Sequence, residues 1–247
     1  MNETKFIDTT WAFIPARGGS KSITLKNMTE MDGRPLIDYV IQSAKASSSV
    51  TRIFCSTDHE KIADFCRKRG VEVQKRPSYL AGDNIATLDV IIYFLETLIR
   101  EEGSIAEILL LLEPTSPFVL PAIIDDCVNL LRSNRDADSV QTITTIPPNH
   151  HAFNQRYIKD GLVHFRFPEE RVGHFTKQSK PEFYVHGNLR VMRCASLLEK
   201  RDIYGDVSLP YIIPRLYAMD VDGPEDLVLA ELYLSSRKVI LPYLHDI

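Results

Sequence analysis

The sequence lacks the features that mark secreted, zinc-binding and membrane proteins. Its four cysteines, Cys55, Cys66, Cys127 and Cys194, lie far apart and include no C-x-x-C pair, which argues against a structural zinc site and predicts reduced, mostly buried thiols. No apolar run is long enough to span a bilayer. Residues 1–8 are polar and contain no signal-peptide core. We therefore expect a cytoplasmic protein without membrane contact.

The chain also carries little net charge. Its 29 Lys and Arg residues and 33 Asp and Glu residues give a net charge of -4, with a pI near 6.0. It has no basic tail or cluster, so we expect no nucleic-acid partner. A length of 247 residues with 44% hydrophobic content suits one large α/β domain, which we place at 1–247. Any anion must therefore be bound by a local site.

Common catalytic and phosphate-binding motifs are missing as well. There is no G-x-G-x-x-G, and the first loop is not a P-loop because Ser20, rather than glycine, precedes Lys21. The adjacent His150 and His151 would point in different directions and make poor joint metal ligands. No Ser/His/Asp or Cys/His arrangement can be argued, so we do not expect covalent catalysis.

Short apolar runs alternate with longer amphipathic ones along the chain. This pattern predicts strands at 11–16, 52–56, 71–74, 108–112 and 139–144, and helices at 36–47, 60–69, 84–102 and 121–133. Regular structure is expected again at 182–193 and 215–220, and a last helix at 224–237. Such alternation predicts an α/β fold with a mainly parallel sheet and helices on both faces. The apolar run 108–112 should be its central strand.

The pattern changes between residues 147 and 183. Prolines, paired histidines, aromatic residues and glycines appear there without helical periodicity. We interpret this segment as an insertion within the single domain that carries a small antiparallel element. It would either cover the site as a lid or meet another subunit.

Four polar segments follow predicted strands: the loop 14–27, the "STD" at 56–58, the "EPTSP" at 113–117 and the "MDVD" at 219–222. Ligands of open α/β sheets bind beyond the carboxyl ends of the strands. We therefore expect these four segments to converge on one edge of the sheet.

The loop 14–27 is cationic. Gly18 and Gly19 would let the backbone approach a ligand closely, and Arg17, Lys21 and Lys26 would suit a polyphosphate. The alternative is a solvated basic turn, and composition alone does not decide between the two.

The segment 219–222 carries a pair of carboxylates. Asp220 and Asp222 lie two residues apart in an extended stretch, so both would face one side. Two carboxylates with phosphate oxygens and water suit Mg²⁺. The alternative is that these aspartates only end a strand before Gly223 and Pro224 start a helix.

Two further residues at strand ends are open to two interpretations. Arg76 either binds a ligand or holds its own loop by hydrogen bonds, with Asp83 or Asn84 capping the next helix. Glu113 follows the predicted central strand and is either a ligand-binding group or a solvated turn residue.

The segments "IPARGGSKSITLKN", "STD", "RPSYLAGDNIAT", "LLLEPTSPF", "KQSKP" and "MDVDGPEDL", in this order, resemble the CMP-N-acylneuraminate (CMP-sialic acid) synthetases and their legionaminate and pseudaminate relatives. The likeness covers roughly residues 11–235. It implies a Rossmann-like nucleotidyltransferase fold, and a homodimer whose inserted segment is the dimerisation element. The implied reaction couples CTP to an acidic 2-keto sugar with Mg²⁺ and releases pyrophosphate.

The resemblance also assigns roles to individual residues. It implies CTP binding by Arg17, Ser20, Lys21, Lys26, Asn27, Arg76, Thr87 and Glu113, with Arg17 and Lys21 stabilising the departing pyrophosphate. Glu113 stands where glutamine is common, and its carboxylate could accept from the cytosine amino group. Lys177, Gln178, His186 and Asn188 would face the sugar, and Asp220 and Asp222 would hold Mg²⁺.

Some positions depart from the family pattern. Ser22 and Thr24 replace a glycine and a proline of the phosphate loop, and "HGNLRV" at 186–191 replaces an N-G-[small]-I-Y type segment that lines the sugar site. Two alternatives follow: an eight-carbon 3-deoxy-octulosonate as acceptor, or a non-catalytic nucleotide-binding protein on the same fold. The pair Lys26-Asn27 favours the sialate-type branch, and the intact Asp220 and Asp222 favour an enzyme.

Overall fold

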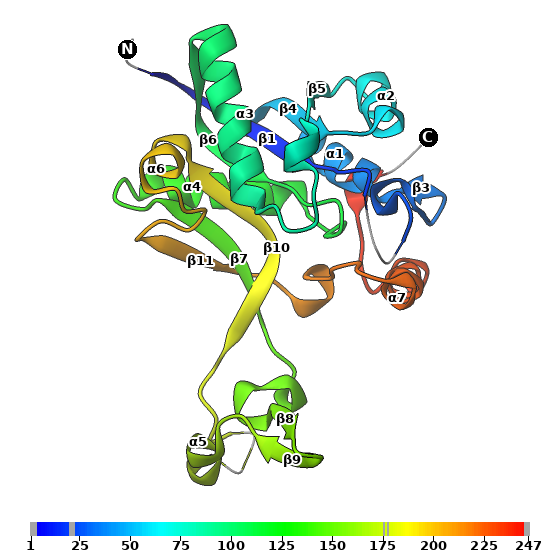
Figure 1. Cartoon of the computed structure of the whole chain (residues 1–247), viewed down its shortest axis with the longest axis vertical. Coiled ribbons are helices and arrows are strands. Elements are labelled where there is room, and N and C mark those ends of the chain that lie inside the picture. Colours follow the sequence, from blue (N-terminus) through cyan, green and yellow to red (C-terminus); the bar gives the residue numbers. More distant parts are fainter. Residues whose placement is uncertain (1–3, 20–22, 175, 177, 245–247) are drawn as a thin grey trace.

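Seven of the described strands form one central sheet (Figure 1). The computed structural model describes residues 4–19, 23–174, 176 and 178–244. In spatial order the strands are β11 (Ser208–Ile212), β7 (Ser139–Thr145), β10 (Tyr184–Arg193), β6 (Ser104–Leu111), β1 (Lys5–Pro15), β4 (Val50–Thr57) and β5 (Glu72–Lys75). β10 is antiparallel to both neighbours, and the other pairs are parallel. The mainly parallel sheet is therefore confirmed, with β6 at its centre as predicted.

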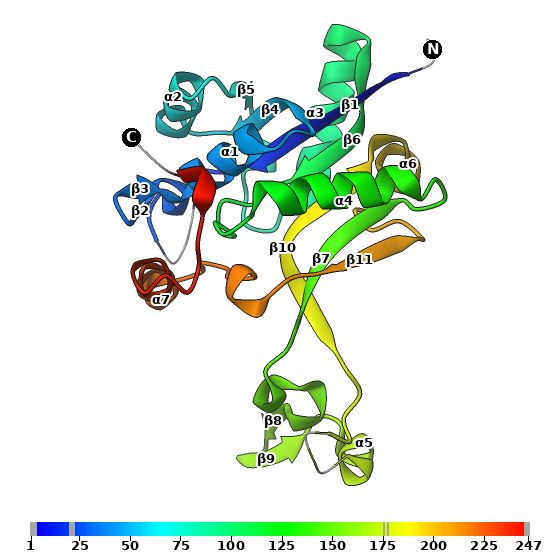
Figure 2. The same cartoon turned by 180° about the vertical axis from the view of Figure 1, so that it is seen from behind.

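Helices cover both faces of the sheet, as the alternating pattern predicted (Figures 1 and 2). α1 (Leu36–Ala46), α2 (Glu60–Lys68) and α4 (Pro121–Ser133) pack on one face. α3 (Thr87–Glu102) and α6 (Cys194–Lys200) pack on the other. The result is a three-layer α/β/α domain of the Rossmann-like type.

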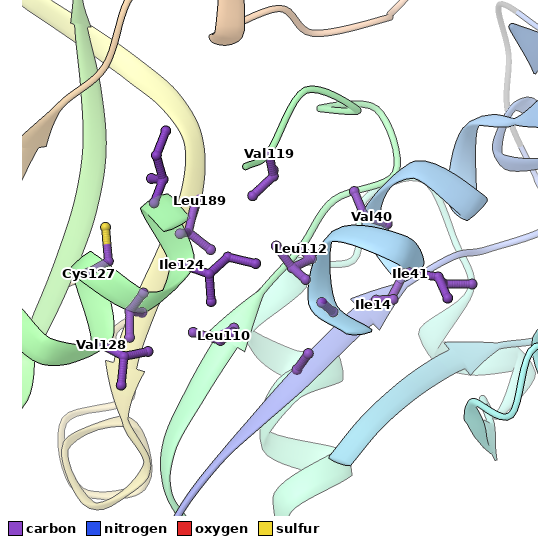
Figure 3. Packing of buried hydrophobic residues seen from close by; sticks show 14 of the residues in the cluster. Ile14, Val40, Ile41, Leu110, Leu112, Val119, Ile124, Cys127, Val128 and Leu189 are labelled. Atoms are coloured by element: carbon purple, nitrogen blue, oxygen red, sulfur yellow. The ribbon is translucent and has the colours of Figure 1, made fainter. Parts of the chain in front are cut away.

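The period of two along the central strands divides the core between these layers. Figure 3 shows Leu110 and Leu112 of the β6 segment and Ile14 of β1 between the helices α1 and α4. Their sequence neighbours Phe13 and Leu111 are buried in the cluster on the α3 and α6 side. A strand with both faces buried has to be apolar throughout, which explains the run of leucines.

A small lobe extends away from the sheet between β7 and β10 (Figures 1 and 2). It contains the antiparallel hairpin of β8 (Arg156–Lys159) and β9 (Leu162–Phe165), within the segment where an antiparallel element was predicted. It also contains the short helix α5 (Pro168–Gly173), which the sequence pattern did not predict. Phe153 lies at the centre of an aromatic cluster with His151, Phe167, His174 and Phe183. Aromatic contacts thus replace a larger core in this lobe.

The C-terminal part of the chain differs from its prediction in two places. Residues 215–220 contain only the short 3-10 helix Arg215–Tyr217, and β11 and α6 were not predicted. The last helix, α7 (Pro224–Ser235), begins where predicted.

The segments β2 (Glu30–Met31) and β3 (Arg34–Pro35) pair locally before α1. Among the described residues, no helix is both long enough and apolar enough to cross a membrane.

Candidate nucleotide and metal site

A cavity of about 260 Å³ lies beyond the carboxyl ends of β1 and β6. Its lining includes all six of the predicted CTP-binding residues that the structure describes: Arg17, Lys26, Asn27, Arg76, Thr87 and Glu113. The rest of the lining is mainly apolar or small and includes Pro15, Leu80, Ile85 and Val90. Ser20, Lys21 and Lys177 lie outside the described residues. Of the four segments predicted to converge, the loop 14–27 and the segment 113–117 contribute to this lining, whereas residues 56–58 and 219–222 do not.

The first loop is fastened to the end of β4. The backbone N–H of Gly18 donates to Asp58 Oδ1 at 2.8 Å, and Asn27 Nδ2 donates to the carbonyl oxygen of Arg17 at 2.8 Å. A Cβ atom on Gly18 would lie 2.8 Å from His59, which is too close for any other residue without a shift. Glycine at this position therefore allows the loop to lie against the "STD" segment.

Arg17 points toward the loop before α3. Its Nη1 atom lies 2.8 Å from Asp83 Oδ1, and both side chains are partly exposed. Such a pair contributes little to folding stability. A phosphate can therefore replace the carboxylate at small cost in free energy. The sequence also suggested Asp83 or Asn84 as the cap of α3. This is wrong, because the N-cap of α3 is Ala86 and no side chain caps the helix.

Arg76 is buried at the end of β5 and also lines the cavity. Its guanidinium donates to the carbonyl oxygen of Ser56 at 2.8 Å and to Ser56 Oγ at 3.3 Å. Burial lowers the pKa of this guanidinium. These bonds hold the end of β5 against the end of β4 rather than Arg76's own loop, and the place of Arg76 in the lining keeps the ligand role open as a prediction.

The acidic segment lies beside the first loop. Lys26 Nζ donates to Asp222 Oδ1 at 3.1 Å, and the N–H of Val221 donates to the carbonyl oxygen of Thr115 at 2.7 Å. The pKa of Asp220 is raised, first because the surrounding protein desolvates it and further because of the charges of Asp222 and Glu113, while a hydrogen bond from Thr115 opposes the shift. The ends of β1 and β6 and the segment before α7 thus form one polar edge.

The start of α7 does not need either aspartate of the predicted metal pair. Asp226 accepts from the N–H groups of Asp222 and Gly223 at 3.0 Å and 2.9 Å and so caps the helix itself. The alternative was that these aspartates only end a strand before Gly223 and Pro224 start a helix. The helix does start there, but residues 219–222 form no strand, so the metal role of the two aspartates stays a prediction.

The donor set fits Mg²⁺. No group of three or more His, Cys, Asp or Glu side chains that could hold a metal ion occurs among the residues that the structure describes. Mg²⁺ does not require such a group, because it keeps several waters and binds through one or two carboxylates and substrate phosphates. Two carboxylates next to a cationic phosphate-type loop match that requirement.

The predicted sugar-binding residues are arranged less tightly. Gln178 is exposed in the lobe. Asn188 is buried, and its amide donates to the carbonyl oxygens of Phe118 at 3.2 Å and Tyr217 at 2.9 Å, while its oxygen accepts from Thr142. These bonds tie β10 to neighbouring segments and occupy the Asn188 side chain. A sugar contact by Gln178 or Asn188 stays a prediction.

His186 is half-buried on β10. Burial and, secondarily, the charge of Arg190 lower its pKa to about 4. Its Nδ1 atom is buried and has no hydrogen-bond partner among the described residues. In the ligand-free protein this environment therefore favours the neutral form of His186 at neutral pH.

The comparison with known families decides the class of protein. The model of the family described as "Cytidylyltransferase" matches residues 11–194. The chain belongs to the cytidylyltransferase family. It is thus a nucleotidyltransferase, as the sequence motifs predicted.

Curated relatives of this cytidylyltransferase include proteins of very different length. It is 26% identical to the N-acylneuraminate cytidylyltransferase of Escherichia coli over 89% of this chain and 50% of that protein. It is 29% identical to post-translational flagellin modification protein B of Campylobacter coli over 92% of this chain and 95% of the other. It is 28% identical to the CMP-N,N'-diacetyllegionaminic acid synthase of Legionella pneumophila over 89% and 94%. The chain thus spans half of the first relative and nearly all of the other two.

Solved structures support the same fold. A CMP:2-keto-3-deoxy-manno-octonic acid synthetase complexed with CTP has a TM-score of 0.66 at 14% identity, covering 93% of this chain and 100% of that chain. A 4-diphosphocytidyl-2C-methyl-D-erythritol synthase from Anaerococcus prevotii has a TM-score of 0.62 at 16% identity, covering 92% and 96%. At these identities the likeness shows the fold alone.

Sequence reasoning missed several residues that shape the site of this cytidylyltransferase. Asp83 pairs with Arg17, Thr115 bonds to Asp220, and Arg190 pairs with Glu113 at 2.8 Å. Thr115 lay in a segment already singled out, and its role could have been predicted there. The partners Asp83 and Arg190 depend on how loops and strands pack, which periodicity does not show.

Proposed function

We propose that this cytidylyltransferase couples CTP to an acidic 2-keto sugar of the sialic-acid-like nine-carbon class and releases pyrophosphate in a Mg²⁺-dependent reaction. The observation that carries the proposal is the single cavity in which Arg17, Lys26, Asn27, Arg76, Thr87 and Glu113 meet beside Asp220 and Asp222. The names of the relatives from Escherichia coli and Legionella pneumophila support the sugar class.

The first loop would bind the triphosphate. Arg17 and Lys26 reach the cavity from the end of β1, and each is now paired with a carboxylate that a phosphate would replace. A guanidinium and an ammonium suit phosphate oxygens because charge-assisted hydrogen bonds are short and strong. Arg17, with Lys21 of the same loop, would then stabilise the charge that builds on the departing pyrophosphate.

The acidic pair would bind the metal ion. Asp220 and Asp222 would hold Mg²⁺, and the bound ion would supply charge neutralisation at the phosphoryl oxygens. Lys26 would keep Asp222 oriented until the nucleotide arrives, since the two side chains are already in contact. The sugar hydroxyl would attack the α-phosphorus in line, so positioning of the two substrates contributes most of the rate.

The sugar would enter next to β10 and the lobe. Gln178 lies in the lobe and His186 near the start of β10, which pairs with β6, the strand whose end borders the cavity. Lys177, next to Gln178 in the sequence, would contribute from the same segment. His186 would contribute a neutral ring to this surface, because its pKa is low.

The lobe would also join two copies of the chain into a homodimer. Its hairpin exposes large apolar side chains on the described surface: Tyr157, Ile158, Leu162 and Val163. Exposed apolar groups in this number, on a lobe that has almost no core of its own, are typical of an interface rather than a solvated surface.

The proposal is tested by product analysis. The protein is incubated with Mg²⁺, CTP and one acid sugar at a time, using N-acetylneuraminate, legionaminate, pseudaminate and 3-deoxy-octulosonate, and the CMP-sugar is detected by mass spectrometry. We expect a product with one nine-carbon sugar. A product with 3-deoxy-octulosonate alone would correct the acceptor and retain the reaction. CTP binding without any product would favour a non-catalytic protein.

A further inference from the structure

An ion pair at the wall of the cavity is not explained by the roles assigned so far. Arg190 of β10 donates from Nη1 to Glu113 Oε2 at 2.8 Å. The pair is partly buried, with side-chain exposures of 14% for Arg190 and 34% for Glu113. Glu113 lines the cavity, whereas Arg190 does not. The arginine therefore stands behind the carboxylate as seen from the cavity.

Strand pairing fixes this arrangement. Arg190 is the register partner of Leu111 in the antiparallel pair of β10 and β6, and Glu113 follows Leu111 by two residues. The guanidinium also lies 5.9 Å from the ring centroid of Tyr204. Two rigid strands and an aromatic ring thus hold the cation in place, so the carboxylate oxygen that it binds has a defined position.

Arg190 depends on Glu113 for its charge balance. Its Nε atom is buried and has no hydrogen-bond partner among the described residues, and Glu113 is its only salt-bridge partner among them. Glu113 is 34% exposed, so water screens this attraction, and the strand register rather than the strength of the ion pair fixes the position of Arg190.

We propose that Arg190 is a positioning residue, which holds Oε2 of Glu113 so that the other carboxylate oxygen accepts a hydrogen bond from a donor group of a substrate. The donor is either the exocyclic amino group of the base or a hydroxyl of the acceptor sugar. The inference rests on the proposed function, because it assumes that the cavity binds these substrates. It makes the pair a determinant of substrate specificity, since a fixed acceptor rejects a group that cannot donate.

Substitution of the carboxylate gives a directional result. In Glu113→Gln, Arg190 would bind the amide oxygen and leave the NH₂ group facing the cavity, which turns an acceptor into a donor. We expect preference for a donor-bearing substrate to fall by about 10-fold to 100-fold. In Arg190→Met the Glu113 carboxylate can rotate, and we expect the preference for a donor-bearing substrate to fall about 10-fold. Arg190→Lys keeps the positive charge and should recover part of this preference.

The chain contains a matched control. Arg193 and Glu107 form a second ion pair between β10 and β6, with side-chain exposures of 16% and 38%, and neither residue lines the cavity. Glu107→Gln should therefore change the melting temperature about as much as Glu113→Gln does, without changing substrate preference.

The test is calorimetric titration of wild type and the four variants with CTP and with UTP. Each acid sugar is titrated in the presence of CTP without Mg²⁺, so that the proposed transfer does not proceed. Loss of the CTP-over-UTP preference in Glu113→Gln and Arg190→Met assigns the donor to the base. An unchanged preference with weaker sugar binding assigns it to the acceptor. If the nucleotide and sugar affinities of the Glu113 and Arg190 variants stay within twofold of wild type while their melting temperatures fall, the pair is purely structural and the inference is wrong.

The titrations, together with the product analysis of the proposed reaction, separate the inference from that reaction. If wild type makes no CMP-sugar with any acceptor but its CTP-over-UTP preference depends on Arg190, the reaction is wrong and the positioning role stands. If wild type makes a CMP-sugar and the Arg190 variants bind every substrate normally, the reaction stands and the positioning role is wrong.

Discussion

Lys26 and Asp222 are 196 positions apart in the chain, yet Lys26 Nζ donates to Asp222 Oδ1 at 3.1 Å. This contact joins the cationic loop that follows the first strand to the acidic segment that precedes the last helix. A phosphate-type site and a pair of carboxylates thus lie side by side, which is the arrangement that a metal-bound nucleotide requires.

Asp222→Asn tests the metal pair. We expect turnover to fall on the order of 100-fold, equivalent to about 3 kcal/mol of transition-state stabilisation. The fold should remain, because Asp222 is exposed and Asp226 caps α7. Initial rates at several Mg²⁺ concentrations give the measurement, with Glu225→Gln on the exposed start of the same helix as control. Near-normal turnover at saturating Mg²⁺ would remove Asp222 from the metal site.

Arg17→Ala tests the phosphate assignment. The affinity for CTP should fall about 10-fold or more, because a charge-assisted bond to phosphate is lost. The melting temperature should change little, since the partly exposed pair with Asp83 is worth about 1 kcal/mol or less. Asp83→Asn is the control, because it disrupts the same ion pair and keeps the arginine. Equal losses of CTP affinity in both variants would make Arg17 a structural residue.

His186 should make the fold sensitive to mild acid. Its pKa falls from 6.5 to about 4 on folding, so the unfolded chain binds more protons between these values. The contribution of neutral His186 is therefore present above pH 6.5 and is lost as the pH falls toward 4. Between pH 7 and pH 5 wild type should lose about 2 kcal/mol more unfolding free energy than His186→Asn. Parallel losses in urea titrations of the two proteins would contradict this.

Asp138 should be a strong stabilising residue outside the site. It accepts from Lys200 and Ser196 and from the backbone N–H groups of Asp206 and Val207, which join β7, α6 and the segment before β11. Although burial opposes it, these bonds hold the pKa of Asp138 well below its usual range. Asp138→Asn should cost on the order of 2 kcal/mol near neutral pH. The unfolding free energies of both variants are measured by denaturant titration, with Asp136→Asn at an exposed position as the control. Equally small losses of unfolding free energy in Asp138→Asn and Asp136→Asn would contradict a stabilising network.

The lobe hairpin gives a test of the proposed dimer. Ile158 is 78% exposed, and Ile158→Asp should shift the protein from dimer to monomer in sedimentation experiments because a buried unpaired charge destabilises an interface. Ile212 on β11 is 60% exposed, and Ile212→Asp is the control expected to leave the association state unchanged. A monomeric wild type, or dissociation by Ile212→Asp alone, would contradict a lobe-mediated dimer.

The central strands and the large helices could be predicted because their residues are buried on a regular period. The apolar run around Leu110 requires burial on both faces, and α4 begins at Pro121 and ends at Ser133 as predicted. The helix α5 was missed because six residues give too short a periodic pattern, and its segment has no apolar face of helical period. The strand β11 was missed because Pro210 lies in the middle of its five residues, and a proline within a short run argues against a strand.

The site could be predicted to the level of segments and not of contacts. Polar segments after parallel strands must meet at one edge, which brought Arg17, Glu113 and Asp222 to the same place. The partner of each side chain depends on loop paths and strand register. That is why Asp83 and Arg190 emerged only from the structure, and why the buried bonds of Asn188 were not anticipated.

The central claim is that the cavity beside Lys26 and Asp222 binds CTP for transfer to an acidic sugar. It is tested most directly by measuring pyrophosphate release from CTP and Mg²⁺ with the acid-sugar panel, in wild type and in Asp222→Asn. We predict release that requires one nine-carbon sugar and falls on the order of 100-fold in the variant. Release that does not depend on an acid sugar, or that is equal in both proteins, would contradict the account.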